Sequence, residues 1–167
     1  LQGCVARMYR GEPIRCLANP LLGHEADPPL QAASPKRVVV VGGGPGGLCA
    51  AFTAAERGHS VVLYERRSTL GGGMHTAAYP PGKGDIAGMI RSYIVRCGKA
   101  GVTFKMGCEA DAAVVSRERP DVVVVATGSR PLVPPIEGAD NPAVIAAEDL
   151  LEGRCTAGRK VLVVGGG

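Results

Sequence analysis

Aromatic residues are scarce in this sequence of 167 residues, which has no tryptophan, four tyrosines and two phenylalanines. Proteins that hold single-stranded nucleic acid stack its bases on aromatic side chains along a basic groove. Here the formal net charge is only +4, and the basic residues are scattered singly or in pairs. The composition therefore argues against a nucleic-acid partner.

Long apolar runs are absent as well. No run approaches the roughly 18 residues that a membrane-spanning helix requires, and no signal peptide opens the chain. We therefore expect no membrane partner and a cytoplasmic protein. The chain also lacks an initiator methionine and stops within a glycine turn at Gly167, so we expect a fragment of a longer protein.

Glycine, in contrast, is abundant, with 25 residues, and one glycine-rich stretch organises the chain. Residues 38–41 are four valines, which is typical of a parallel strand buried on both faces. The pattern G-x-G-x-x-G follows at Gly42, Gly44 and Gly47. In dinucleotide-binding units the first glycine permits a tight turn, the second lets the backbone approach a pyrophosphate, and the third lets the next helix pack against the strand.

The residues after this motif complete the unit. Pro45 suits a first helical turn, because the N–H that it lacks would have no helical partner there. A second apolar strand at 61–64 leads to Glu65, 23 positions after Gly42, where such units place the acid that binds the adenosine ribose. We expect the diphosphate at the helix N-terminus. Arg66 and the arginine after it are either solvated or read a 2′-phosphate, which keeps NADP open beside FAD and NAD.

The rest of the chain continues the alternation of strands and helices. Apolar residues recur at helical spacing over 85–97, with Asp85 as the expected N-cap. Residues 102–106 alternate as a strand, 122–125 are four valines typical of another strand buried on both faces, and 146–151 form a short predicted helix. The pattern predicts an α/β fold, namely a doubly wound, Rossmann-like FAD/NAD(P)-binding domain with a parallel sheet, present in part.

The end of the chain repeats its beginning, because RKVLVVGGG at 159–167 is similar to KRVVVVGGG at 36–44. A repeat of this kind indicates that a second Rossmann-like unit opens here. A flavoprotein that binds FAD and then NAD(P)H needs two such units. We therefore divide the chain into a linker at 1–35, an FAD-binding domain at 36–158 and the start of an NAD(P)-binding domain at 159–167.

Residues 1–35 carry five prolines and no long periodic pattern, so we expect loop with at most short helical turns. Cys4 and Cys16 enclose eleven residues in this segment. Spacing alone leaves two interpretations open: two unrelated thiols, or two ligands of a metal cluster that holds the irregular segment in place. We interpret His24 as a loop histidine rather than a ligand.

The sequence Q-G-C at 2–4, CLANPLLGHE at 16–25 and the glycine turn that follows together resemble the old yellow enzyme-related iron-sulfur flavoproteins. That family includes 2,4-dienoyl-CoA reductase, 2-enoate reductase and trimethylamine dehydrogenase. The resemblance implies a [4Fe-4S] cluster held by C-x2-C-x3-C-x11-C, with Cys4 and Cys16 as the third and fourth ligands and the first two just before the start of the chain. Thiolates are the usual ligands of such clusters.

The same resemblance implies further contacts with FAD. The Leu-Gly-Gly turn at Gly71 and Gly72 would approach its diphosphate, although Gly73 stands where the family usually has glutamine. The backbone around Ala110 would touch adenine, and the Ala-Thr-Gly turn after the second valine strand would pass close to the cofactor. The predicted cofactor-binding residues are Gly42, Gly44, Pro45, Gly46, Gly47, Glu65, Arg66, Gly71, Gly72, Ala110, Ala126, Thr127 and Gly128, and the predicted metal ligands are Cys4 and Cys16.

By this resemblance, the parent protein takes hydride from NAD(P)H onto FAD and passes single electrons through the cluster to FMN in an N-terminal barrel of the same chain. The barrel would reduce an enoyl- or dienoyl-type substrate or oxidise an amine. No residue here is a convincing acid, base or nucleophile, so we predict no catalytic residue and an inactive fragment. Two alternatives remain open: a flavoprotein like the small subunit of glutamate synthase, or a module like that of trimethylamine dehydrogenase with a structural ADP.

Overall fold

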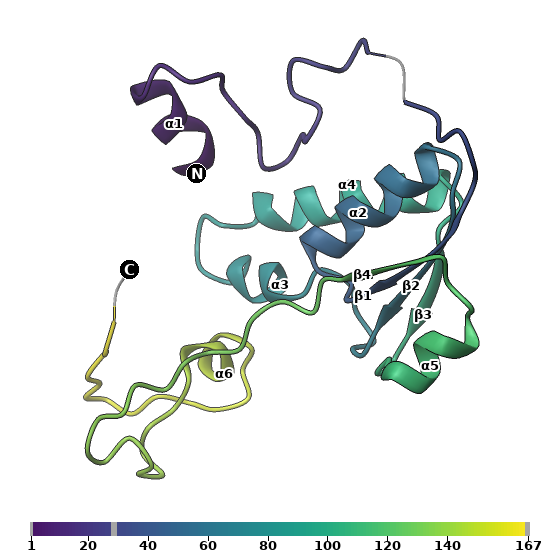
Figure 1. Ribbon diagram of the computed structural model, residues 1–167. Coiled ribbons are helices and arrows are strands. Elements are labelled where there is room, and N and C mark those ends of the chain that lie inside the picture. The colour runs from purple at the N-terminus through teal and green to yellow at the C-terminus, as the bar shows by residue number, and fades with distance from the viewer. Residues whose placement is uncertain (1, 28–29, 166–167) are drawn as a thin grey trace.

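A four-stranded parallel sheet forms the centre of the computed structural model, which describes residues 2–27 and 30–165, with the backbone alone for residues 2–4 (Figure 1). The strands are β1 (Arg37–Val41), β2 (Ser60–Glu65), β3 (Thr103–Met106) and β4 (Val122–Val125). Their order is β3-β2-β1-β4, which is that of a doubly wound nucleotide-binding sheet. The predicted α/β fold class is therefore confirmed.

The strands are in register, so that their carboxyl ends meet at one edge of the sheet. Val41 at the end of β1 pairs with Tyr64 of β2 and Val125 of β4. The glycine turn and the segments at 108–110 and 126–128 follow these strand ends and lie at the same edge. In open α/β sheets, ligands bind outside the carboxyl ends, at the point where the strand order reverses. Here that point lies between β1 and β4.

Helices cover both faces of the sheet. Figure 1 shows α2 (Pro45–Glu56) and α4 (Asp85–Lys99) together on one face, and α5 (Ala112–Arg117) beside β3 on the other. α2 packs against β1, β2 and α4.

The core lies between the sheet and the α2–α4 pair. Leu48 and Phe52 of α2 and Leu63 of β2 are its largest fully buried side chains. The predicted apolar stripe of α4 faces this core, as expected: Ile90, Tyr93 and Cys97 are buried, and Met89 and Ile94 pack against them. The predicted N-cap is wrong by one residue, because Gly84 is the N-cap and Asp85 is the first helical residue.

A salt bridge joins the two long helices. Arg96 of α4 donates from Nε and an η nitrogen to the two carboxylate oxygens of Glu56, at 2.5 and 2.7 Å. Its guanidinium also lies 4.2 Å from the centre of the Phe52 ring, which meets the Tyr93 ring edge to face at 5.2 Å. The pKa of Arg96 is raised, chiefly by the hydrogen bonds to Glu56. Polar and aromatic contacts therefore fix α4 against α2.

β4 differs from the prediction of a strand buried on both faces. Val123 is 43% exposed and Val125 is 74% exposed, whereas Val39 and Val40 of β1 are fully buried. The difference follows from position, because β4 is at the edge of the described sheet and β1 is at its middle. A run of four valines predicts a parallel strand, but it does not reveal how many neighbours that strand has.

Three helices were not predicted: α1 (Gln2–Tyr9), α3 (Gly73–Ala77) and α5. α1 has eight residues, so the expectation of at most short turns over 1–35 is wrong there. The start of α5 could have been predicted from Asp111, which is a typical N-cap residue. Its side chain accepts a hydrogen bond from the Val114 N–H at 2.8 Å. Within residues 2–27 and 30–165, no helix combines the length and the apolar character needed to cross a membrane.

The segment after β4 runs through a long loop to α6 (Ala147–Leu151), which lies within the helix predicted at 146–151. Residues 159–165, predicted to open a second Rossmann-like unit, form no strand, and Val161 and Val163 are exposed. A strand requires a neighbour for its backbone groups, and none of the described segments pairs with this one. The last two glycines of the repeat lie outside the described residues.

Candidate functional site

The glycine turn between β1 and α2 has the close contacts that its glycines predict. Gly42 has φ +108°, and a Cβ there would collide with the carbonyl group of Ala126 at the end of β4. A Cβ on Gly47 would collide with the carbonyl oxygen of Gly42, so this glycine lets α2 approach the strand. At both positions, backbone atoms of the protein therefore fill the space that a side chain would need.

The N-terminus of α2, in contrast, opens onto free space. A Cβ on Gly44 or Gly46 would meet no atom within 4 Å. Gly44 is the N-cap without a side-chain cap, and Pro45 is the first helical residue. In the described structure, no hydrogen-bond acceptor is recorded for the N–H groups of Gly46 and Gly47. Free N–H groups and the helix dipole make such an end suited to an anion.

Glu65 has a structural role that the sequence did not predict. Its carboxylate is buried, with Oε2 accepting from the Gly43 N–H at 2.7 Å and Oε1 accepting from the Arg67 N–H at 2.8 Å. A carboxylate oxygen carries two lone pairs, so each oxygen retains one acceptor site for a ribose hydroxyl. Glu65 therefore fixes the glycine turn and keeps the acceptor capacity that its predicted role requires.

The Leu-Gly-Gly turn touches the glycine turn directly. The Gly71 N–H donates to the carbonyl of Gly43 at 2.8 Å, and a Cβ on Gly72 would lie 3.1 Å from the Cα of Gly44. Gly73 begins α3. The predicted cofactor-binding residues of these two turns are thus brought together. His75 and Tyr79 lie near each other, with ring centres 6.5 Å apart, and neither lines the pocket described next.

A pocket of about 300 Å³ lies at the carboxyl edge of the sheet. Six predicted residues line it: Gly42, Glu65, Arg66, Ala110, Thr127 and Gly128. Six further residues were not predicted: Val41, Tyr64, Cys108, Glu109, Ser129 and Arg130. Val41 and Tyr64 lie at the carboxyl ends of β1 and β2, and the other four lie in the loops that follow β3 and β4. Their position after parallel strands is the signal that would have found them. A larger hollow of about 560 Å³ between β3 and α5 has neither a glycine turn nor a helix N-terminus, so we place the site in the smaller pocket.

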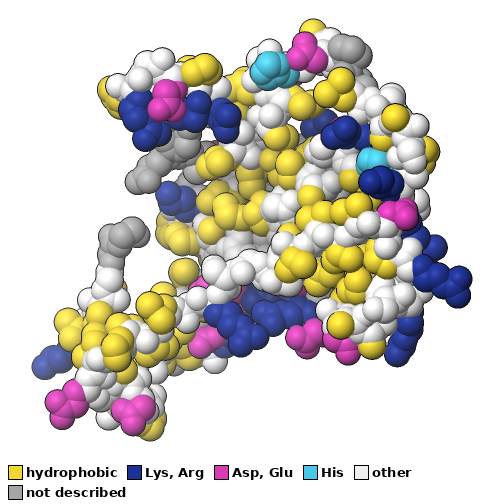
Figure 2. All heavy atoms as spheres, in the orientation of Figure 1, with side chains coloured by type: hydrophobic (Ala, Val, Ile, Leu, Met, Phe, Trp, Pro, Cys, Tyr) yellow, Lys and Arg dark blue, Asp and Glu magenta, His cyan; other side chains and the backbone are white. Residues whose placement is uncertain are grey.

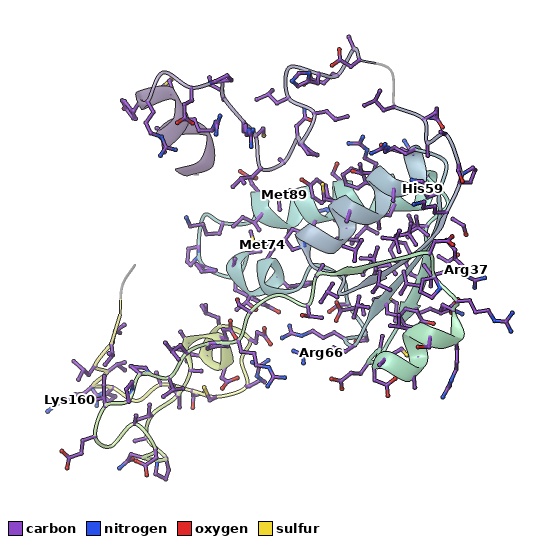
Figure 3. All side chains as sticks on the ribbon, viewed as in Figure 1. Arg37, His59, Arg66, Met74, Met89 and Lys160 are labelled. Carbon is purple, nitrogen blue, oxygen red and sulfur yellow. The ribbon has the colours of Figure 1, made fainter. Side chains whose placement is uncertain are left out.

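The pocket carries charge of both signs. Arg66, Arg130 and Glu109 are exposed on its wall, and the buried Glu65 lines it as well. Arg66, labelled in Figure 3, projects from the carboxyl end of β2 on the side of the sheet away from α2 and α4. Two arginines on the pocket wall favour an anionic ligand.

Tyr64, which lines the pocket, is held by an ion pair. Tyr64 donates its hydroxyl to Oε1 of Glu118 at 2.7 Å, and Arg37 donates to Oε2 of Glu118 at 2.6 Å. The hydrogen bond to Glu118, together with burial, raises the pKa of Tyr64 to about 12. The hydrogen bonds from Tyr64 and Arg37 lower the pKa of Glu118. The network fixes the wall of the pocket between β1, β2 and the end of α5.

The predicted metal ligands are described only in part. The side chain of Cys4 lies outside the described residues, and Cys16 is a half-buried free thiol. The Tyr93 hydroxyl donates to the carbonyl of Leu17 at 2.8 Å, which ties this segment to α4. Among the described side chains, no group of three or more metal ligands comes together. His24 pairs with Asp27 at 2.8 Å on the surface.

The comparison with known families agrees with this geometry. A family model described as pyridine nucleotide-disulphide oxidoreductase matches residues 36–167. The chain belongs to this family. Membership of this family implies FAD and NAD(P)H as cofactors. The domain is thus part of a family of NAD(P)H-dependent flavoprotein oxidoreductases.

Individual relatives narrow the assignment within the family. An NADH oxidase of Thermoanaerobacter brockii is 41% identical over 99% of this chain and 26% of its own length. A cinnamate reductase of Clostridium sporogenes is 37% identical over 99% of this chain and 25% of its own length. A solved 2-naphthoyl-CoA reductase in complex with 2-naphthoyl-CoA is 39% identical, with a TM-score of 0.85, over 94% of this chain and 24% of that one. The recognition of an old yellow enzyme-related flavoprotein reductase is confirmed.

The chain spans about a quarter of the length of these relatives. The matches to the NADH oxidase and the cinnamate reductase cover 99% of this chain, so they include the cysteine-bearing segment at 1–35 as well as the sheet domain.

Proposed function

We propose that the chain is the FAD-binding, electron-transfer part of an NAD(P)H-dependent flavoprotein oxidoreductase. The observation that carries this proposal is the set of contacts around Gly43. Its N–H is held by the buried Glu65 and its carbonyl by Gly71, beside an open helix N-terminus and a pocket at the strand ends. This arrangement supplies N–H donors for a diphosphate and a carboxylate for a ribose.

Eleven of the thirteen predicted cofactor-binding residues contact the dinucleotide in this proposal. Gly44, Gly46 and Gly47 present backbone N–H groups to the diphosphate, and Glu65 accepts from the ribose. Arg66 balances the diphosphate charge. The other predicted contacts come from the backbone: Gly71 and Gly72 beside the diphosphate, Ala110 beside adenine, and Ala126, Thr127 and Gly128 along the cofactor. Bound FAD would accept a hydride from NAD(P)H and release electrons singly, and the protein binds and orients it.

We further propose that Cys4 and Cys16 supply two ligands of a [4Fe-4S] cluster, which passes electrons to FMN in an N-terminal barrel of the parent chain. Thiolates are the usual ligands of such clusters, which normally take four, so the proposal requires two more outside this chain. Two observations support it. The relatives match through the cysteine-bearing segment, and the Tyr93 hydroxyl holds Leu17, next to Cys16, against the sheet domain.

For the whole protein we propose reduction of an activated alkene of enoyl or dienoyl type, in the cytoplasm. The names of the cinnamate reductase and the 2-naphthoyl-CoA reductase support this substrate class. The described cysteines, Cys16, Cys49, Cys97, Cys108 and Cys155, are free thiols, which is usual in a reducing compartment. Amine oxidation by a module with a structural ADP is the second candidate, and a flavoprotein like the glutamate synthase small subunit is the third.

The intact protein, purified without oxygen, tests these proposals through its released cofactors and its visible spectrum. FAD, FMN and iron, with a broad band that dithionite bleaches, are expected. ADP in place of FAD would favour the structural module. FAD with iron but without FMN would favour the glutamate synthase type. A protein with no dinucleotide of either kind would overturn the proposed site.

A further inference from the structure

The carboxylate of Glu152, the C-cap residue of α6, joins separate parts of the chain. The Thr76 hydroxyl of α3 donates to Oε1 at 2.5 Å, and the Arg67 guanidinium donates to the same oxygen at 3.4 Å. Arg154 pairs with Oε2. The Glu152 side chain is only 15% exposed and Thr76 is buried, so the contact between them is shielded from water, whereas the side chains of Arg67 and Arg154 are 41% and 49% exposed.

The contacts of Glu152 close a ring around the glycine turn. On one side, the Arg67 N–H donates to Glu65, which in turn accepts from the Gly43 N–H. On the other side, Thr76 belongs to α3, and the turn that precedes α3 donates to the carbonyl of Gly43. Both arms of the ring therefore end on the peptide groups of Gly43, and Glu152 is the link between the arms.

Glu152 also anchors the segment that follows β4. Among the described residues, only Glu152 forms hydrogen bonds or ion pairs between residues 127–165 and the preceding part of the chain, through Arg67 and Thr76. Figure 2 shows basic and acidic side chains gathered where the α6 segment meets the sheet domain. In the sequence, the anchored segment leads directly to the second glycine motif, RKVLVVGGG at 159–167.

We propose that Glu152 is a positioning residue of the dinucleotide site and couples that site to the α6 segment. The inference rests on the proposed function, because it takes the glycine turn to be the place where FAD or ADP binds. Glu152 holds the loop after β2 and α3 in the places where Glu65 and Gly71 contact Gly43. A dinucleotide that binds the ordered turn also stabilises the anchored α6 segment, because coupling between two sites is reciprocal.

Release of FAD from the intact protein tests the positioning role. The rate is followed after dilution by the recovery of flavin fluorescence, or by chromatography if the bound nucleotide is ADP. Glu152→Gln and Thr76→Val are each expected to release it about tenfold faster, which corresponds to about 1.4 kcal/mol. The double variant should lose little more than either single variant, because contacting residues act non-additively.

Glu148→Gln is the matched control. Glu148 lies on the same short helix and is exposed, and no contact of its side chain is recorded in the described structure, so its variant should release the cofactor at the wild-type rate. Thr76→Val keeps the shape of the buried side chain, so it remains informative if Glu152→Gln folds poorly.

Hydrogen exchange of residues 147–155 tests the coupling. In the wild-type protein, bound dinucleotide should slow exchange there, and Glu152→Gln should abolish the difference between the bound and stripped forms. Wild-type release rates in both single variants would overturn the inference and leave the dinucleotide site intact. A wild-type protein that carries neither FAD nor ADP would overturn the proposed function and this inference together.

Discussion

The carbonyl oxygen of Ala126 lies in the space that a side chain on Gly42 would occupy. The ends of β1 and β4 therefore meet backbone to backbone, and the Ala126 N–H also donates to the carbonyl of Val41 at 2.8 Å. The first glycine of the motif is thus required by the fold, whether or not a cofactor is bound.

Gly42→Ala should destabilise the protein itself. A side chain there needs φ near +108° and displaces Ala126, so we expect the free energy of unfolding to fall by about 2 kcal/mol or more. Chemical denaturation of the cofactor-free protein measures this loss. An unchanged midpoint would show that β4 can move away from the turn at little cost.

Gly44→Ala should separate binding from folding. Gly44 has φ −73° and open space around its Cβ direction, so alanine fits the backbone and the unfolding midpoint should stay close to that of the wild type. The added methyl group occupies space at the helix N-terminus where we propose the diphosphate. We therefore expect FAD affinity to fall about tenfold or more, as measured by titration. Retained affinity would place the diphosphate elsewhere.

Tyr64→Phe should change how stability depends on pH. The folded-state pKa of Tyr64 is raised from 10.0 to about 12 by Glu118 and burial, so the wild-type protein loses this contribution as pH rises from about 10 to about 12. The pKa of Glu118 is lowered by its bonds to Tyr64 and Arg37, so that contribution is lost as pH falls below 4.5. Denaturation curves across pH should flatten in both windows in the variant. Tyr9→Phe, at an 82% exposed tyrosine, should leave both windows unchanged.

Arg96→Lys should loosen α4 from α2. Lysine lacks the planar fork that donates from two nitrogens to the two oxygens of Glu56, and it stacks less well on Phe52. We therefore expect a loss of about 1 kcal/mol in the free energy of unfolding. Arg91→Lys, at an exposed arginine of the same helix, provides the control for a surface change. Equal stability of the two variants would mean that the Arg96 contacts contribute nothing measurable.

The dinucleotide-binding unit could be predicted from the sequence, because its requirements are local. The four valines, the glycine pattern and Glu65 each follow from a requirement of the backbone or ligand within about 30 residues. The exposure of β4 could not be predicted from the sequence, because it depends on which strands lie beside Val123 and Val125. The hydrogen bond from Gly43 to Glu65 was also missed, since it exists only when β1 and β2 are placed side by side. The N-cap at Asp111 could have been predicted from the sequence, but we did not predict it.

The two backbone hydrogen bonds of Gly43 also affect how a ligand associates with the glycine turn. Its N–H and its carbonyl are both bonded within the protein, so the turn holds its shape before any ligand arrives. A preorganised turn loses little conformational entropy when a ligand docks. Association should therefore proceed as nearly rigid docking, without a slow rearrangement of the turn.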